Sequence, residues 1–148
     1  MSENHDIDVV RTFHEKLGAR DISGLLDLAT EEIGVGGGRG HGEGKEFFLE
    51  WVRYASITVT PRRWFRKVNL EREGRHGMPG ELMSTLVVEE DAVWHAARTG
   101  RETGRMRFAT IYEVENGRLA GIARYGNIGE AVTTAGMYEE NEIAVVAS

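Results

Sequence analysis

A glycine-rich stretch that ends in a lysine is the first part of this sequence whose residue types could do chemistry. Residues 34–45 read GVGGGRGHGEGK. The phosphate-binding pattern G-x-x-x-x-G-K-[ST] would need a glycine five positions before Gly44 and a hydroxyl after Lys45. Arg39 and Glu46 stand there instead, and no frame of the stretch fits the dinucleotide pattern G-x-G-x-x-G. The stretch is therefore not interpreted as a nucleotide site.

The histidines offer a second route to chemistry. They show neither H-x-x-H nor H-E-x-x-H spacing, and without cysteines there is no thiolate ligand, so the sequence predicts no metal and no cofactor. His41 lies among glycines that let a ligand approach the backbone closely. It is a candidate ligand-binding residue, with a solvated surface position as the alternative. His14 is expected at the edge of the core.

Composition limits the class of protein. The 148 residues suit one domain with a substantial core, and a net charge of -6 argues against binding to nucleic acid or an anionic membrane. No apolar run approaches the ~20 residues of a membrane span. The N-terminal sequence MSENHDID is unlike a signal peptide. We expect a cytoplasmic protein.

The order of elements follows from the period of the apolar residues. Helical spacing predicts helices over 7–17, 21–29 and 45–55, the second with Asp21 as its N-cap. From residue 57 the period changes to two. Strands are expected over 57–71, 81–89, 92–98, 104–115 and 117–126, and a short helix over 128–136.

Two of the connections carry specific expectations. Glu90-Asp91 is taken as the join between two strands, and Asn116-Gly117 as a tight hairpin turn. Residues 71–80 read as a polar connection. Helices followed by a run of strands predict an α+β fold, in which a curved, mostly antiparallel sheet wraps around three N-terminal helices.

This order, together with several strings, resembles the NTF2-like superfamily, in particular its SnoaL-like and ketosteroid-isomerase-like branch. The strings are VVRTFHEKLGARDISGLLDLA, GEGKEFFLEWV, YEVENGRLAGIARYGN and EAVTTAG. The resemblance implies a cone-shaped single domain over residues 1–137, with a tail over 138–148. It also implies an interior pocket, a glycine-rich stretch beside the pocket mouth, and a homodimer formed through the outer sheet face.

The catalytic groups that the resemblance would supply are replaced. Phe13 stands where ketosteroid isomerases have a tyrosine, Gly36 stands at or near the position of the aspartate base, and Thr110 stands near the late-strand acid. Arg124 takes the place of an aspartate of epoxide-hydrolase-like members and cannot serve as a base. No catalytic residue is assigned.

The expected pocket contains aromatic residues and a few polar groups. Arg124 would bind an anion if it faces inward, or form a rim salt bridge or an interface contact if it does not. Trp94 and its neighbour His95 must face opposite sides, and which one faces the pocket stays open. The candidate ligand-binding residues are Phe13, His41, Trp51, Trp64, Trp94, Phe108, Thr110, Tyr112 and Arg124.

Two functions follow from this reading. The first is a SnoaL-like domain that binds a small apolar or weakly anionic molecule in its interior. The alternative is an isomerase, dehydratase or cyclase that acts on a polyketide- or steroid-like substrate with unusual acid/base residues, drawn from His41, Tyr112 and Arg124. A third possibility is a pure dimerisation module with its interior filled by side chains. It would need neither an open cavity nor a titratable group beside one.

Overall fold

The structure, a computed structural model, describes residues 5–37, 40–53, 56–69 and 83–145. The first part of the described chain consists of three helices and a hairpin: α1 (His5–Ala19), α2 (Ile22–Leu28), β1 (Ala29–Gly37), β2 (Gly40–Glu43) and α3 (Lys45–Arg53). Four long strands follow: β3 (Ile57–Asn69), β4 (Met83–His95), β5 (Glu102–Glu115) and β6 (Arg118–Tyr125). The last elements are α4 (Ile128–Thr134), a 3-10 turn (Glu139–Asn141) and β7 (Glu142–Ile143).

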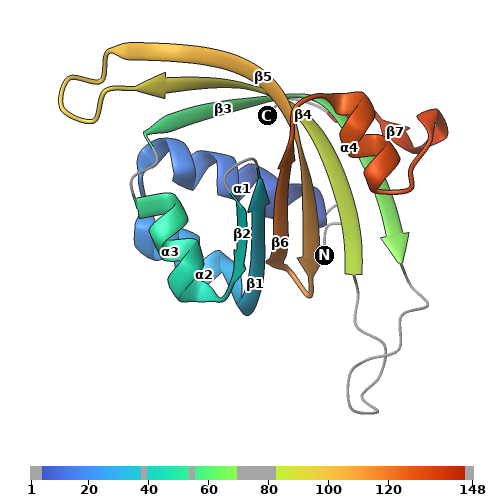
Figure 1. Ribbon diagram of the computed structural model, residues 1–148. Helices are drawn as coiled ribbons and strands as arrows, with labels where there is room; N and C mark the ends of the chain where they lie inside the picture. The colour runs from blue at the N-terminus through green and yellow to red at the C-terminus, as the bar shows by residue number, and fades with distance from the viewer. Residues whose placement is uncertain (1–4, 38–39, 54–55, 70–82, 146–148) are drawn as a thin grey trace.

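The strands form one curved sheet in the order β2-β1-β6-β5-β4-β3-β7. Only the β1–β6 pair is parallel among the described strand pairs. The sheet bends around α1, α2 and α3 on one face, α4 lies on the other face, and the β4–β5 hairpin reaches past the helices (Figure 1). The predicted α+β fold with a mostly antiparallel sheet is confirmed.

Local sequence signals account for several element boundaries. The side chain of Asp21 accepts a hydrogen bond from the backbone N–H of Gly24 at 3.0 Å, so it caps α2 as predicted. Asn116 and Gly117 have φ angles of 48° and 81°, as the tight turn between β5 and β6 requires. The polar connection predicted at 71–80 lies outside the described residues.

The join expected at Glu90-Asp91 is wrong, because β4 continues through both residues. Glu90 pairs with Phe108 and Asp91 with Arg107 in a ladder to β5 that is regular from Met83 to Trp94. Alternation sends the Glu90 side chain to the inner face, whereas Asp91 forms ion pairs with Arg62 and Arg107 at the surface. Each carboxylate has partners, so two acidic residues can stand in mid-strand.

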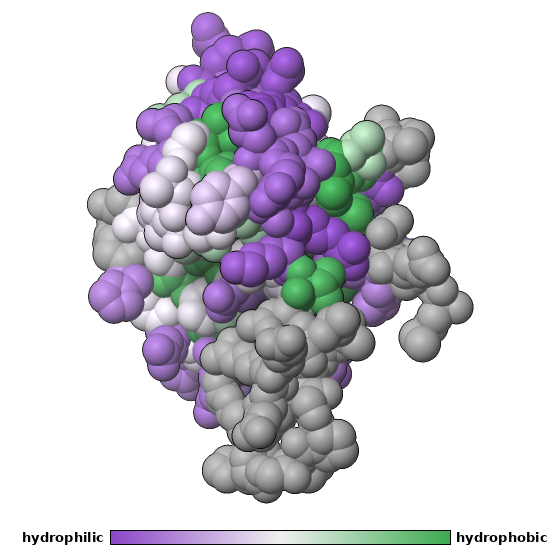
Figure 2. Space-filling model, turned by 90° about the vertical axis from the view of Figure 1, so that its right-hand side faces the viewer, coloured by the Kyte–Doolittle hydropathy of each residue, from purple (hydrophilic) through white to green (hydrophobic). Residues whose placement is uncertain are grey.

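Apolar side chains pack on both faces of the sheet. The larger cluster lies between the sheet and α1–α3 and includes Val10, Phe13, Phe48 and Leu86. A smaller cluster lies under α4: Phe65, Val87, Ala109, Ala131 and Met137. Viewed from the side of α4, the surface is largely hydrophilic, with hydrophobic residues in small separate patches (Figure 2). No helix among the described residues has the length and apolar character to cross a membrane.

Candidate functional site

A pocket of about 640 Å³ opens between α3, the end of β1, the extended part of β4 and β5, and the end of β6. Its walls are mainly aromatic and apolar, and we call it the mouth pocket. The side chains that define it are Phe47, Trp51, Trp94, Met106, Phe108 and Arg124, with Tyr125 and Glu130 at one side. Phe47 and Met106 are exposed at its rim, 40% and 54% respectively. The size and lining suit a small, mainly apolar molecule.

Arg124 is the cation of the mouth pocket. Its guanidinium carbon lies 4.2 Å from the ring centre of Phe108 and 5.3 Å from that of Trp51. Its Nε is buried without a hydrogen-bond partner, and no carboxylate of the described chain forms an ion pair with it. Burial lowers the pKa of Arg124 below its usual value, while Tyr112 and Glu90 act in the opposite direction. The guanidinium is therefore held by aromatic faces and not by a counter-ion.

At the C-terminal end of β4, the structure shows which of Trp94 and His95 faces the mouth pocket. Trp94 lines the pocket and packs edge-on against Phe108, with ring centres 6.3 Å apart. His95 turns away and contacts the hydroxyl of Thr58 at 2.9 Å and the carbonyl of Gly100 at 3.1 Å. Trp94 thus belongs to the pocket wall, and His95 ties the β4–β5 hairpin to β3.

The glycine-rich stretch forms the β1–β2 hairpin at the edge of the mouth pocket. Gly36 and Gly37 contribute bare backbone to the pocket wall. At Gly42 a Cβ would lie 2.6 Å from the ring of Phe47, so any other residue would force that rim side chain to shift from its place on the hairpin. The glycines shape the rim of a pocket, as the resemblance implied.

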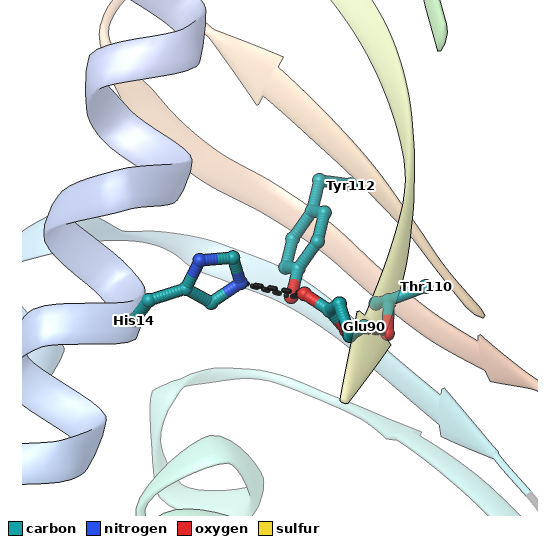
Figure 3. A network of polar contacts seen from close by, with 4 residues as sticks. All are labelled: His14, Glu90, Thr110 and Tyr112. Carbon is teal, nitrogen blue, oxygen red and sulfur yellow. Dashed lines mark hydrogen bonds and ion pairs between the residues drawn. The ribbon is translucent and has the colours of Figure 1, made fainter. Parts of the chain in front are cut away.

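A buried polar cluster lies deeper in the cone, and we call its four residues, His14, Glu90, Thr110 and Tyr112, the Glu90 network (Figure 3). Glu90 is 1% exposed. Its Oε1 accepts a hydrogen bond from the Thr110 hydroxyl at 2.5 Å, and its Oε2 accepts one from the Tyr112 hydroxyl at 2.5 Å. His14 Nε2 lies 2.5 Å from the same Oε2. The carboxylate is thus satisfied from three directions, as a buried charge must be.

The proton positions in the Glu90 network follow from its donors and acceptors. When Glu90 is ionised its carboxylate only accepts, and the 2.5 Å contact then requires a proton on His14 Nε2. His14 Nδ1 is buried and has no partner in the described chain. Burial and the adjacent Glu90 raise the pKa of Tyr112 well above its usual value. The phenol is therefore a stable hydrogen-bond donor and not a base.

The nine predicted ligand-binding residues separate into three groups. Trp51, Trp94, Phe108 and Arg124 come together around the mouth pocket. Phe13, Trp64, Thr110 and Tyr112 are buried around or within the Glu90 network and do not line that pocket. His41 is exposed on β2 and lines a different depression, of about 470 Å³, with Ile111 and Thr134.

Sequence reasoning did not find Glu90, and it gave His14 no site role. A usable signal existed in β4, because an unbroken strand puts Glu90 in phase with Val88, Ala92 and Trp94. A lone acid within an apolar face is a candidate buried carboxylate. Because a join between two strands was expected at Glu90-Asp91, Glu90 was not assigned to the apolar face of β4.

Two further observations define the surroundings of the site. His14 also lines a second cavity, of about 330 Å³, between α1 and β3. In the described ranges, no group of three or more His, Cys, Asp or Glu side chains could hold a metal ion.

The architecture is similar to known structures, although the sequence is far from theirs. No sequence profile of a protein family matches the chain, and no characterised protein matches it significantly. An NTF2-like protein of unknown function from Burkholderia pseudomallei is 18% identical with a TM-score of 0.58, over 90% of this chain and 97% of that one.

Two of the other structural neighbours are named for a reaction or a bound molecule. An LEH-like epoxide hydrolase from M. tuberculosis is 14% identical with a TM-score of 0.57, over 88% of this chain and 84% of that one. The orange carotenoid protein of Anabaena, in complex with canthaxanthin, is 15% identical with a TM-score of 0.60; the match covers 81% of this chain and 35% of that one. The chain therefore has the NTF2-like fold, as the resemblance implied. A hydrolase and a carotenoid binder share this fold, so the fold alone does not select a function.

Proposed function

We propose that this chain binds a small, mainly apolar molecule with an anionic group, and that the anionic group lies against Arg124 in the mouth pocket. The observation that carries the proposal is the guanidinium itself. It faces an open pocket, its Nε is buried without a partner, and no carboxylate among the described residues pairs with it. A half-buried cation without a counter-ion costs free energy that an anionic ligand would offset.

The apolar part of the ligand would lie between aromatic walls. Trp51 and Phe108 flank the guanidinium, and Trp94 packs against Phe108. Flat ring systems stack well on such surfaces. A molecule of two fused rings with one acidic group matches this combination of flat walls and a single cation.

The test compares two ligands that differ only in charge, 2-naphthoate and 2-naphthamide, by calorimetric titration. We expect the anion to bind more tightly. The substitution Arg124→Leu should weaken its binding about 10–100-fold, because a charge-assisted contact is lost, and should leave binding of the amide nearly unchanged. Arg118→Leu, an exposed arginine on the same strand β6, is the matched control. Equal affinities of the wild type and Arg124→Leu for 2-naphthoate would refute the proposal.

A second candidate, an enzyme of the isomerase or lyase type, is favoured by the buried carboxylate of the Glu90 network. Glu90 could accept a proton from a ligand carbon if the ligand reached past Phe108. The measurement is exchange of the α-protons of 2-tetralone in D₂O, followed by NMR. Enzymatic exchange that disappears in Glu90→Gln would support this candidate, and exchange at the uncatalysed rate would reject it.

A further inference from the structure

Two opposite charges lie close to each other on the inner face of the sheet: Arg124 in the mouth pocket and Glu90 in the buried network behind it. Arg124 and Glu90 do not form an ion pair with each other in the described chain. They are neighbours through Thr110, which pairs with Arg124 across β5 and β6 and donates a hydrogen bond to Glu90. With His14 neutral, their formal charges sum to zero. An anion beside Arg124 would neutralise that cation and leave the negative charge of the buried Glu90 uncompensated, which is costly unless a proton compensates it.

His14 is the group placed to take up that proton. Its side chain is 6% exposed, and its Nε2 lies 2.5 Å from Glu90 Oε2 and 3.1 Å from the Tyr112 hydroxyl. In the neutral ring with Nε2–H toward Glu90, the lone pair of Nδ1 has no partner in the described chain. Protonation there would make an imidazolium–carboxylate pair. The second cavity borders His14 and offers a path for the proton from solvent.

We propose that binding of an anion beside Arg124 is coupled to the uptake of one proton by His14, an inference that rests on the proposed function. Linkage makes the effect reciprocal, so the bound anion also favours protonated His14. The affinity for a fully ionised ligand then rises as the pH falls from about 8 to about 6, by up to about tenfold per pH unit.

Charged groups on every element around His14 favour or oppose a positive charge on its imidazole ring. Arg11 of α1 and Arg62 of β3 line the second cavity with His14 and oppose a positive imidazole, whereas Glu15 of the same cavity favours it. Arg62 is partly neutralised by Asp91, 3.1 Å away. The remaining groups are Glu90 of β4, Tyr112 of β5, Arg124 of β6, and the Asp6–Arg66 pair near the start of α1. An anion beside Arg124 adds a negative charge to this set.

The test uses 2-naphthalenesulfonate, which is ionised at every pH of interest, so any proton taken up must come to the protein. Titration calorimetry at about pH 7.5 in phosphate and in Tris, buffers of different ionisation enthalpy, counts the protons bound with the ligand. Phosphate is first checked as a competitor. We expect uptake approaching one proton in the wild type. His14→Gln, whose amide can still donate to Glu90, should reduce the uptake to near zero and make the affinity independent of pH.

The outcomes separate the coupling from the function on which it rests. Binding that depends on Arg124 but takes up fewer than about 0.2 protons overturns the coupling and leaves the proposed function intact. Binding unaffected by Arg124→Leu overturns both. Should His14→Gln not fold, ¹⁵N shifts of the histidine rings in the wild type report the same event. Protonation of His14 on ligand addition supports the coupling, and an unchanged neutral ring rejects it.

Discussion

The mouth pocket and the Glu90 network lie on the same inner face of the sheet, yet the charged group in the network has hydrogen-bond partners and the one in the pocket has no counter-ion in the described chain. Glu90 is closed off from water and has three hydrogen-bond partners. Arg124 lies beside an open space of about 640 Å³ and is covered only by aromatic rings. A satisfied buried charge indicates a structural role, whereas an unsatisfied one beside a cavity indicates a place for a ligand. Partners distinguish the two regions better than burial does.

The largest effect on stability should come from removing the carboxylate of the Glu90 network. Glu90→Ala leaves the Tyr112 and Thr110 hydroxyls and His14 Nε2 without their acceptor, so we expect the free energy of unfolding to fall by about 3–5 kcal/mol. Urea denaturation measures it. Glu90→Gln keeps a carbonyl acceptor and should cost less, about 1–2 kcal/mol. A loss below about 1 kcal/mol in Glu90→Ala would mean that the network does not stabilise the fold, and the contrast with Arg124 would disappear.

The opposite result is expected at Arg124. Arg124→Met exchanges a poorly partnered cation for an apolar chain of similar length and gives up two cation–π contacts. The free energy of unfolding should stay unchanged or rise by up to about 1 kcal/mol, while binding of 2-naphthoate weakens. Thermal and urea unfolding of the two proteins without ligand check it. Destabilisation by more than about 2 kcal/mol would assign Arg124 a structural role like that of Glu90.

A smaller effect should appear at the rim of the mouth pocket. In Gly42→Ala the new methyl group meets the Phe47 ring, which must shift, so we expect a loss of about 1 kcal/mol and a several-fold change in 2-naphthoate affinity. Gly34→Ala in the same hairpin is the control, since its Cβ would meet nothing of the described chain within 4 Å and Gly34 does not line the mouth pocket. If both variants behave alike, the packing of Phe47 on the hairpin does not define the rim.

The smallest effect belongs to an exposed carboxylate. Arg63 donates two hydrogen bonds to Glu142, at 3.0 and 2.9 Å, and lowers the pKa of that carboxyl below its usual value. A lowered pKa in the folded state means that the contribution is present near neutral pH and is lost as pH falls through the folded-state value. Glu142→Gln at neutral pH should therefore mimic acid. Hydrogen exchange should quicken only around β7, with the Glu90 network unchanged. Exchange that quickens throughout the protein would contradict this.

Local features of the fold could be predicted from the sequence because their causes lie within a few residues. The Asp21 cap, the Asn116-Gly117 turn and the apolar stripe of α1 each depend on neighbours along the chain. The change from helical to strand period likewise indicated an α+β fold. The continuation of β4 through Glu90 and Asp91 was missed, because local polarity suggested a break and only the partners of the two carboxylates explain their place in the strand.

The sequence by itself determined the kinds of element, their order, and a supply of aromatic residues with Arg124 near the end of the last long strand. Tertiary structure alone decided which of them meet. His14 lies 76 positions before Glu90 and 98 before Tyr112, and their contact depends on how α1 docks and on the register of β4 and β5. Strand register decides which face each side chain occupies, and it is set by the packing of the whole sheet. For that reason the mouth pocket, the unpaired Arg124 and the buried Glu90 became visible only in the folded chain.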